Sequence, residues 1–291
     1  MDALNRSKRP RGKGKARSPF NSALARFAAA PHMLWSVLFI VAPLIFVIYF
    51  AFTNVNGEFT LENISMLSTY SKTFVLSLLF SLIATVICLL VGYPLAYFIA
   101  RMSPRKQRLF ITMVMIPMWI SLLIRTYSLM ALLDNGGIVS GLLVSLGFEK
   151  LSFIGTGGAV ILGMVYDFLP YMVLPIYTSI SKLDNRYLEA AGDLGCNGFK
   201  TLTRVVMPLS LPGVISGITM VFVPSISTFY ISQKLGGGAF DLIGDTIERQ
   251  FQNKLTYHTG AAISLVMMVL ILISLAIMNR FSDDEGGELI V

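Results

Sequence analysis

Two charged side chains interrupt otherwise apolar stretches of this sequence. Arg125 lies in the run Ser121-Leu-Leu-Ile-Arg-Thr-Tyr127, and Asp167 lies in Tyr166-Asp-Phe-Leu-Pro-Tyr171. A charge that faces lipid is costly, so each side chain is expected to face other protein or a water path. Two interpretations follow from the residues: the two charges pair with each other, or Asp167 faces a pore and attracts a cation.

A second pattern lies between Tyr187 and Gly213, and it predicts a short helix, a glycine break at Gly195 and a second helix. Pro208 is expected near the start of the following apolar helix, where its missing donor does little harm. An amphipathic turn of this kind suits a groove on a partner protein. The first helix is expected to present one face of small and apolar residues, formed by Glu189, Ala190, Ala191 and Leu194. The second is expected to continue an apolar ridge, formed by Phe199, Leu202 and Val205.

Other common chemical motifs are missing. A nucleotide-binding Walker A loop needs Gly-Lys-Ser/Thr, but Lys200-Thr201 follows Phe199 rather than a glycine. Cys88 and Cys196 lie in different settings and suggest neither a disulfide framework nor a zinc site. The residues therefore predict no metal and no bound cofactor in this chain.

The composition shows what surrounds these residues. Of the 291 residues, 55% are hydrophobic and 13% are charged, whereas soluble domains carry about 25% charged residues. An ordinary soluble enzyme, a disordered protein and a disulfide scaffold are thereby excluded. The net charge of +7 equals the surplus of residues 1–26, where eight Lys and Arg face one Asp. The positive charge therefore lies in a basic N-terminal tail, and the rest of the chain is neutral. No nucleic-acid partner is expected.

Six stretches are long and apolar enough to cross a bilayer, which takes about 20 residues. Prolines within or beside them predict bent helices that line a cavity or move, although packing geometry explains prolines equally well. The expected helices span residues 33–53, 73–100, 109–133, 159–180, 209–232 and 259–279. The fold class is therefore an all-α polytopic membrane protein.

Lys and Arg residues between the spans predict the orientation. With the N-terminus inside, seventeen lie in inside segments and five in outside loops. Both termini are expected in the cytosol. The expected organisation is a largely disordered basic tail over 1–30 with a possible short helix, a transmembrane domain over 31–280 with a cytosolic loop at 181–207, and an acidic tail over 281–291. The basic tail is expected to contact anionic membrane lipid.

The loop also resembles a known family. Glu189, Gly195 and Pro208 match the spacing of the EAA loop in permease subunits of ABC importers, although Met207 replaces the usual leucine. Gly92-Tyr-Pro-Leu-Ala-Tyr-Phe98, Leu123-Ile-Arg-Thr-Tyr127, Leu169-Pro-Tyr-Met-Val-Leu-Pro175 and Phe229-Tyr-Ile-Ser232 resemble the first permease subunit of spermidine/putrescine importers.

The resemblance implies a type I ABC-importer permease (MetI-like) fold with six transmembrane helices in a bacterial plasma (inner) membrane. It implies a non-catalytic subunit that docks on a homodimer of ATP-binding subunits through Glu189, Ala190, Ala191, Leu194, Gly195, Phe199 and Pro208. ATP and magnesium would be bound by that ATPase. A second permease subunit, different in sequence, and an extracellular or periplasmic solute-binding protein complete the implied assembly.

A polyamine path would need acceptors, carboxylates and aromatic faces for protonated amines. The candidates near membrane depth are Tyr127, Tyr166, Asp167, Tyr171, Phe229, Tyr230 and Gln233. An aromatic belt at the membrane interface is the alternative explanation for any one of these rings. Alternative functions are a permease for another small solute, a secondary transporter, and a channel or membrane scaffold.

Overall fold

The computed structural model describes residues 31–147 and 152–286. The chain divides into two compact units, Met1–Tyr49 and Phe50–Val291. The first unit contributes most of one apolar helix, which runs from Pro31 to Ala51 and includes η1 (Val37–Val41) and α2 (Ala42–Ala51). The basic tail predicted over 1–30 lies outside the described residues, as do 287–291 of the predicted acidic tail.

Helices account for nearly all of the second unit. In chain order they are α3 (Glu62–Ser65), η2 (Met66–Tyr70), α4 (Ser71–Ala100), α5 (Pro104–Trp119), α6 (Leu122–Leu133), α7 (Ile138–Ser145), α8 (Gly157–Ser181), α9 (Asn185–Asp193), α10 (Gly198–Thr201), η3 (Leu202–Val206), α11 (Met207–Ser227), α12 (Tyr230–Leu235), α13 (Ile243–Gln252) and α14 (Tyr257–Gly286). Five described helices are long and apolar enough to cross a membrane, and α5 with α6 and α7 makes a sixth, bent candidate. The described helices therefore give five candidate spans, or the predicted six when the bent pair is counted as one span.

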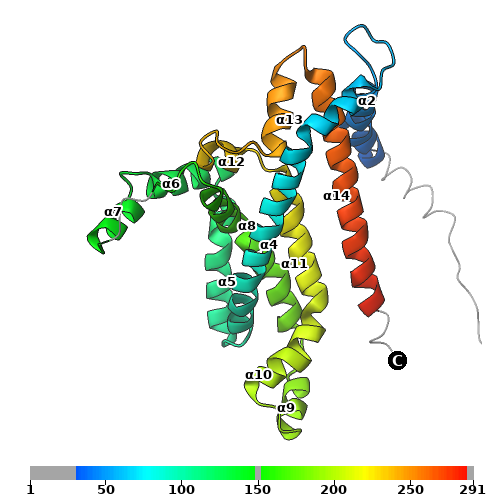
Figure 1. Ribbon diagram of the computed structural model, residues 1–291. Coiled ribbons are helices and arrows are strands. Elements are labelled where there is room, and N and C mark those ends of the chain that lie inside the picture. Colours follow the sequence, from blue (N-terminus) through cyan, green and yellow to red (C-terminus); the bar gives the residue numbers. More distant parts are fainter. Residues whose placement is uncertain (1–30, 148–151, 287–291) are drawn as a thin grey trace, which may run out of the picture. The chain divides into compact units, whose positions relative to one another are not determined.

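Three helices, α4, α8 and α11, pack against one another and form the core of this unit (Figure 1). Glycines let them approach closely, as is common between membrane helices. A Cβ at Gly213 of α11 would lie 2.8 Å from the Pro175 carbonyl oxygen of α8, and one at Gly217 would lie 2.9 Å from the Met172 sulfur. The core is therefore built on backbone proximity as well as on apolar side chains.

Two predicted spans are interrupted, which corrects the expectation of continuous helices over 109–133 and 209–232. α5 ends at Trp119, Ile120 and Ser121 are extended, and the chain turns by 96° before it continues into α6. α11 ends at Ser227, and Thr228 is extended before α12 begins. Each break follows a proline, Pro117 or Pro224, by two or three residues. The apolar composition that predicted continuous spans does not indicate where a helix is interrupted.

Other prolines are accommodated without a break. α4 continues through Pro94, and α8 continues through Pro170 and Pro175. Pro43 and Pro208 each follow a π-helical turn, η1 or η3, by two residues. The wider π turn relieves the clash between a proline ring and the carbonyl four residues earlier.

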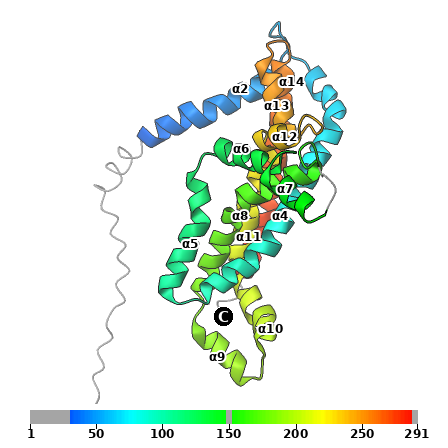
Figure 2. The ribbon, with the colours of Figure 1, turned by 90° about the vertical axis from the view of Figure 1, so that its left-hand side faces the viewer.

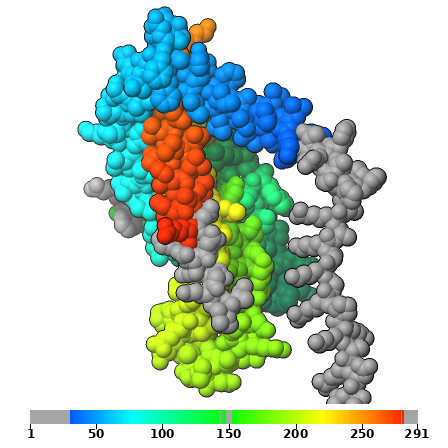
Figure 3. Space-filling view, turned by 90° about the vertical axis from the view of Figure 1, so that its right-hand side faces the viewer, coloured from blue at the N-terminus to red at the C-terminus, as the bar shows by residue number. Residues whose placement is uncertain are grey.

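The second unit has two distinct ends (Figures 1 and 2). α9 and α10 project at one end, and α13 lies at the other. α14 packs along α11 and α13 and occupies the surface on the face drawn in Figure 3. α14 continues to Gly286, so it extends past residue 280, where the predicted transmembrane domain ended.

Candidate functional site

The projecting α9–α10 segment is built by local capping. Asp184 accepts a hydrogen bond from the Arg186 amide at 3.0 Å and begins α9, and Asn197 accepts one from the Lys200 amide at 2.9 Å and begins α10. Gly195 lies between the helices with φ of +76°, a left-handed conformation that favours glycine. The predicted helix, glycine break and second helix are confirmed.

The side chains of this segment divide into two faces. Ala191 is buried and Leu188 packs against the core, whereas Leu194 is 85% exposed and Phe199 is 73% exposed. Glu189 and Ala190 are also exposed. The prediction that Glu189, Ala190, Ala191 and Leu194 share one face is therefore wrong for Ala191, because α9 turns that side chain toward the bundle.

The predicted ridge of Phe199, Leu202 and Val205 is divided in the same way. Leu202 packs against the core while Phe199 points to the surface. Pro208 is exposed and lies in the first turn of α11, as predicted. Exposed Leu194 and Phe199 leave apolar surface at the tip of the segment, which is typical of a site that a partner covers.

Arg125 of α6 and Asp167 of α8 form a buried ion pair. Arg125 Nη1 lies 3.1 Å from Asp167 Oδ1, and the two side chains are 6% and 0% exposed. Arg125 Nη1 also donates to the Asp167 carbonyl oxygen at 3.2 Å, and the Thr126 hydroxyl donates to Asp167 Oδ2 at 3.4 Å. Of the two interpretations left open by the sequence, the structure shows the pairing of the charges.

An aromatic cluster forms between α6 and α12. The rings of Tyr127 and Tyr230 meet edge to face with centroids 5.9 Å apart. Lys234 Nζ lies 5.3 Å from the Tyr127 centroid and 5.7 Å from the Tyr230 centroid. The structure thus brings together two predicted path residues and places a lysine of the same chain against their rings, in cation–π geometry.

The remaining predicted aromatic residues do not join this cluster. Tyr171 packs on the core near Phe168 of the same helix, with ring centroids 6.3 Å apart. Tyr166 is 40% exposed on α8, and Phe229 is 41% exposed. Phe229 was expected at the end of the fifth span and lies instead just after the break that ends α11.

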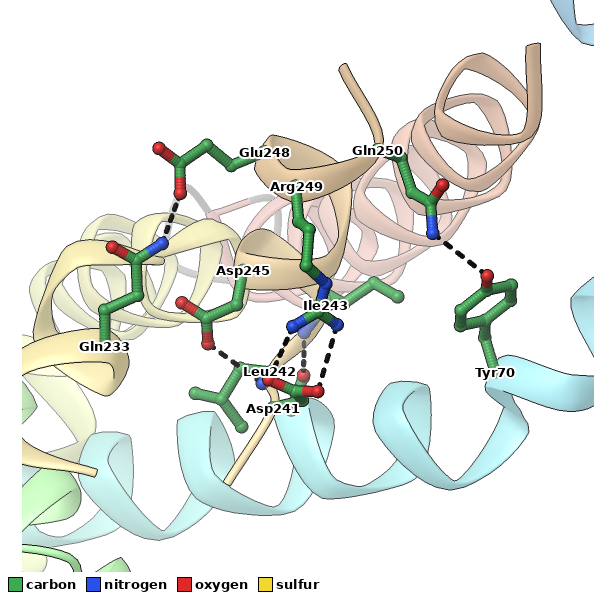
Figure 4. A network of polar contacts seen from close by, with 10 residues as sticks. Tyr70, Gln233, Asp241, Leu242, Ile243, Asp245, Glu248, Arg249 and Gln250 are labelled. Carbon is green, nitrogen blue, oxygen red and sulfur yellow. Dashed lines mark hydrogen bonds and ion pairs between the residues drawn. The ribbon is translucent and has the colours of Figure 1, made fainter. Parts of the chain in front are cut away.

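A polar network surrounds α13 (Figure 4). Gln233 Nε2 donates to Glu248 Oε2, and Gln252 Nε2 donates to Glu248 Oε1 at 3.0 Å. Arg249 binds both carboxylate oxygens of Asp241, at 3.2 and 3.0 Å. Gln233 was predicted as a path residue, but the acidic residues around it were not.

The position of α13 depends on close packing. A Cβ at Gly244 would lie 2.6 Å from the Thr228 carbonyl oxygen, so only glycine lets α13 begin against the break after α11. The Ile243 amide donates to the Ser77 hydroxyl of α4 at 2.7 Å. The spacing of Asp241, Asp245 and Glu248 at intervals of four and three residues could have indicated one acidic helical face.

Asp245 is the buried member of this network. Its Oδ2 accepts a hydrogen bond from the Leu242 amide at 3.0 Å, as in a capping box. Burial first, and Asp241 to a smaller extent, raise the pKa of this carboxyl to about 6, against the opposing effects of Ser232, Leu242 and Arg249. The side chain is 4% exposed.

Comparison with known proteins places this geometry in context. Residues 92–284 match the family described as "Binding-protein-dependent transport system inner membrane component". The "Spermidine/putrescine transport system permease protein PotB" of Haemophilus influenzae is 35% identical over 270 residues, covering 89% of this chain and 94% of that protein. The protein of the same name from Escherichia coli K12 is 37% identical over 258 residues, covering 85% and 94%.

Solved structures share the fold at low sequence identity. A chain of a bacterial alginate ABC transporter, in complex with an alginate-bound periplasmic protein, aligns with a TM-score of 0.73 and 18% identity, covering 90% of this chain and 95% of that one. A chain of the MetNI methionine ABC transporter aligns with a TM-score of 0.57 and 14% identity, covering 76% and 98%.

Proposed function

Because the chain belongs to the family of binding-protein-dependent transport system inner membrane components, we propose that it carries polyamines as one permease subunit of an ATP-driven importer. Membership makes it a multi-pass inner-membrane permease, a non-catalytic subunit of such a system. The observation that carries the polyamine proposal is its similarity to the two named spermidine/putrescine permeases across 85–89% of its length. Carboxylates and aromatic rings near α12 and α13 are consistent with a cationic solute.

The proposed path contains Tyr127, Tyr166, Asp167, Tyr171, Phe229, Tyr230 and Gln233. Tyr127 and Tyr230 would present their ring faces to a passing ammonium group, which would displace the Lys234 ammonium from those rings. Asp167 would contribute to the path while paired with Arg125. That pairing would keep the Asp167 carboxylate from binding the transported polyamine too tightly. A second permease subunit, different in sequence, would supply the facing half of the path.

The proposed link to ATP hydrolysis is the α9–α10 segment. Glu189, Ala190, Leu194 and Phe199 are exposed there, and they would enter a groove on one subunit of an ATPase homodimer, which binds ATP and magnesium. Ala191, Gly195 and Pro208 would hold the shape of the segment. Differential contact with the two ATPase states would rock α11, which follows directly in the chain.

The proposed orientation places both termini and α9–α10 in the cytosol, as the distribution of Lys and Arg favours. α13 lies at the other end of the second unit and would face a solute-binding protein outside the membrane (Figure 1).

Reconstitution tests this function. Proteoliposomes containing the chain, the second permease and the ATPase, supplied with the loaded solute-binding protein, are expected to accumulate labelled spermidine only with internal ATP. Omission of the ATPase is the control. Uptake by the chain alone would contradict the importer and favour a secondary transporter, and uptake of an uncharged solute but not of spermidine would contradict the polyamine proposal.

Coupling has its own test. Glu189→Lys reverses the charge of an exposed side chain at the proposed interface, so uptake and stimulated ATPase activity are expected to fall together by at least tenfold while assembly remains measurable. Lys182→Glu, an exposed charge reversal just before α9, is the matched control. Unchanged activity in Glu189→Lys would contradict the docking role.

A further inference from the structure

A polar cavity of about 340 Å³ lies beside α13, at the end of the second unit opposite α9 and α10. It lies outside the helices that could span the membrane. Its lining residues come from α12, from the following loop and from one face of α13. The polar ones are Gln233, Asp241, Asp245, Glu248, Arg249 and Gln252.

The charges of this cavity do not cancel. Arg249 is engaged by both carboxylate oxygens of Asp241 (Figure 4). Asp245 and Glu248 remain, and no other lysine, arginine or histidine lines the cavity. Two carboxylates without a partner cation give the cavity a negative potential, which attracts a positively charged ligand.

Asp245 supplies the observation that points to a ligand. One of its oxygens accepts the Leu242 amide, but the other, Oδ1, is buried and has no hydrogen-bond partner among the residues that the structure describes. The neighbouring Ser232 hydroxyl, which lowers the pKa of Asp245, donates to the Phe229 carbonyl oxygen at 2.9 Å. A buried carboxylate oxygen without a donor carries a desolvation penalty, which an incoming donor would remove.

Glu248 lies on the same face of α13 as Asp245 and also lines the cavity. Both of its oxygens accept amide N–H groups, one from Gln233 and one from Gln252. These neutral donors orient the carboxylate without neutralising it, and they leave the two amide oxygens as further acceptors. The cavity therefore presents carboxylate and amide oxygens from several directions.

We propose that this cavity binds a primary ammonium group of the transported cation before that cation enters the membrane path. The inference rests on the proposed polyamine function and adds the place of first capture. An ammonium group carries one charge and three N–H donors, which match the carboxylates of Asp245 and Glu248 and one amide oxygen. A metal ion fits less well, since the described residues contain no group of three His, Cys, Asp or Glu side chains placed to hold one.

Binding to the intact complex tests the inference. The complete permease–ATPase complex in lipid nanodiscs, without the solute-binding protein, is titrated calorimetrically with spermidine, putrescine and the uncharged analogue 1,4-butanediol. We expect both amines to bind and the diol not to bind. Asp245→Asn and Glu248→Gln are each expected to weaken amine binding at least tenfold. Asp134→Asn, which removes an exposed carboxylate outside the cavity, is expected to leave it unchanged.

Uptake by the wild-type complex separates the two proposals. If polyamine uptake is absent, the proposed function is wrong and the inference falls with it. If uptake is normal but both variants bind spermidine as the wild type does, only the inference is overturned. Should Asp245→Asn fail to assemble, Glu248→Gln alone decides the outcome, because its side chain is only half-buried.

Discussion

Asp167 and Asp245 are both buried, but their surroundings differ. Asp167 lies between α6 and α8 and meets Arg125 at 3.1 Å and the Thr126 hydroxyl at 3.4 Å. Asp245 lies at the start of α13, accepts one backbone amide and keeps one oxygen unpartnered among the described residues. The charge of a carboxylate with a resident cation is already neutralised, whereas one without such a partner is open to a ligand.

The largest expected effect comes from breaking the ion pair between Arg125 and Asp167. Arg125→Leu leaves the Asp167 carboxylate buried without its cation, and such a loss costs about 3–5 kcal/mol in the free energy of unfolding. Thermal unfolding of the solubilised protein measures it. The double variant Arg125→Leu/Asp167→Leu is expected to recover most of the loss. Equal stability of the single and double variants would show that the pair is not coupled.

The same conservative change at the two aspartates should have opposite effects on stability. Asp167→Asn removes the charge that Arg125 needs and is expected to destabilise the fold. Asp245→Asn retains an acceptor for the Leu242 amide and removes an unneutralised buried charge, so it is expected to stabilise the fold by about 1–2 kcal/mol at pH 7.5. Destabilisation by both changes, measured by thermal unfolding, would remove the distinction between the two regions.

Titration of Asp245 predicts a pH dependence of spermidine binding. With its pKa near 6, the folded carboxyl holds a proton more tightly than an unfolded aspartate does. The contribution of Asp245 to the free energy of unfolding is therefore fully present below about pH 4, and it is lost as the pH rises through 6. The ionised form binds ammonium, so spermidine affinity is expected to fall about tenfold from pH 7.5 to 5. Calorimetric titration should find a flatter profile in Asp245→Asn, and an equally steep one would assign the titration elsewhere.

The smallest effect concerns Lys234, which lies on α12 between the two regions. α12 contacts both α6 and α13. Lys234→Gln removes the cation from the Tyr127 and Tyr230 rings and should cost about 0.5–1 kcal/mol of stability. The vacated rings are expected to lower the spermidine concentration for half-maximal uptake by a few-fold. Lys254→Gln, an exposed change on the loop after α13, is the control. An identical uptake curve would exclude Lys234 from the path.

Helix positions could be predicted because they depend on local composition. Apolar stretches of about 20 residues marked the starts of the spans to within a few residues, and Pro208 marked the start of α11, but the breaks after α5 and α11 and the end of α14 were not predicted. The breaks after Pro117 and Pro224 could not be separated in advance from prolines that helices accommodate, such as Pro94 and Pro170. That outcome depends on whether neighbouring helices and wider turns can take up the freed carbonyl groups.

The candidate site was only partly predictable for a related reason. Residue type predicted Tyr127, Tyr230 and Gln233 as site residues, but it did not predict Lys234, Asp245 and Glu248, which lie in a segment without long apolar stretches. Their importance depends on contacts between α12 and α13, which residue types alone do not specify.

The sequence by itself determined that this chain spans a membrane several times and that a helix–glycine–helix segment follows the fourth span. These properties depend on hydropathy, charge distribution and backbone preferences that act within a few residues. Only the tertiary structure decided that Arg125 meets Asp167 across 42 positions, that Ala191 faces inward while Leu194 and Phe199 face outward, and that Asp245 forms no ion pair with the residues that the structure describes. Burial and pairing are set by which helices pack together, and a charge is neutralised only where that packing brings its partner.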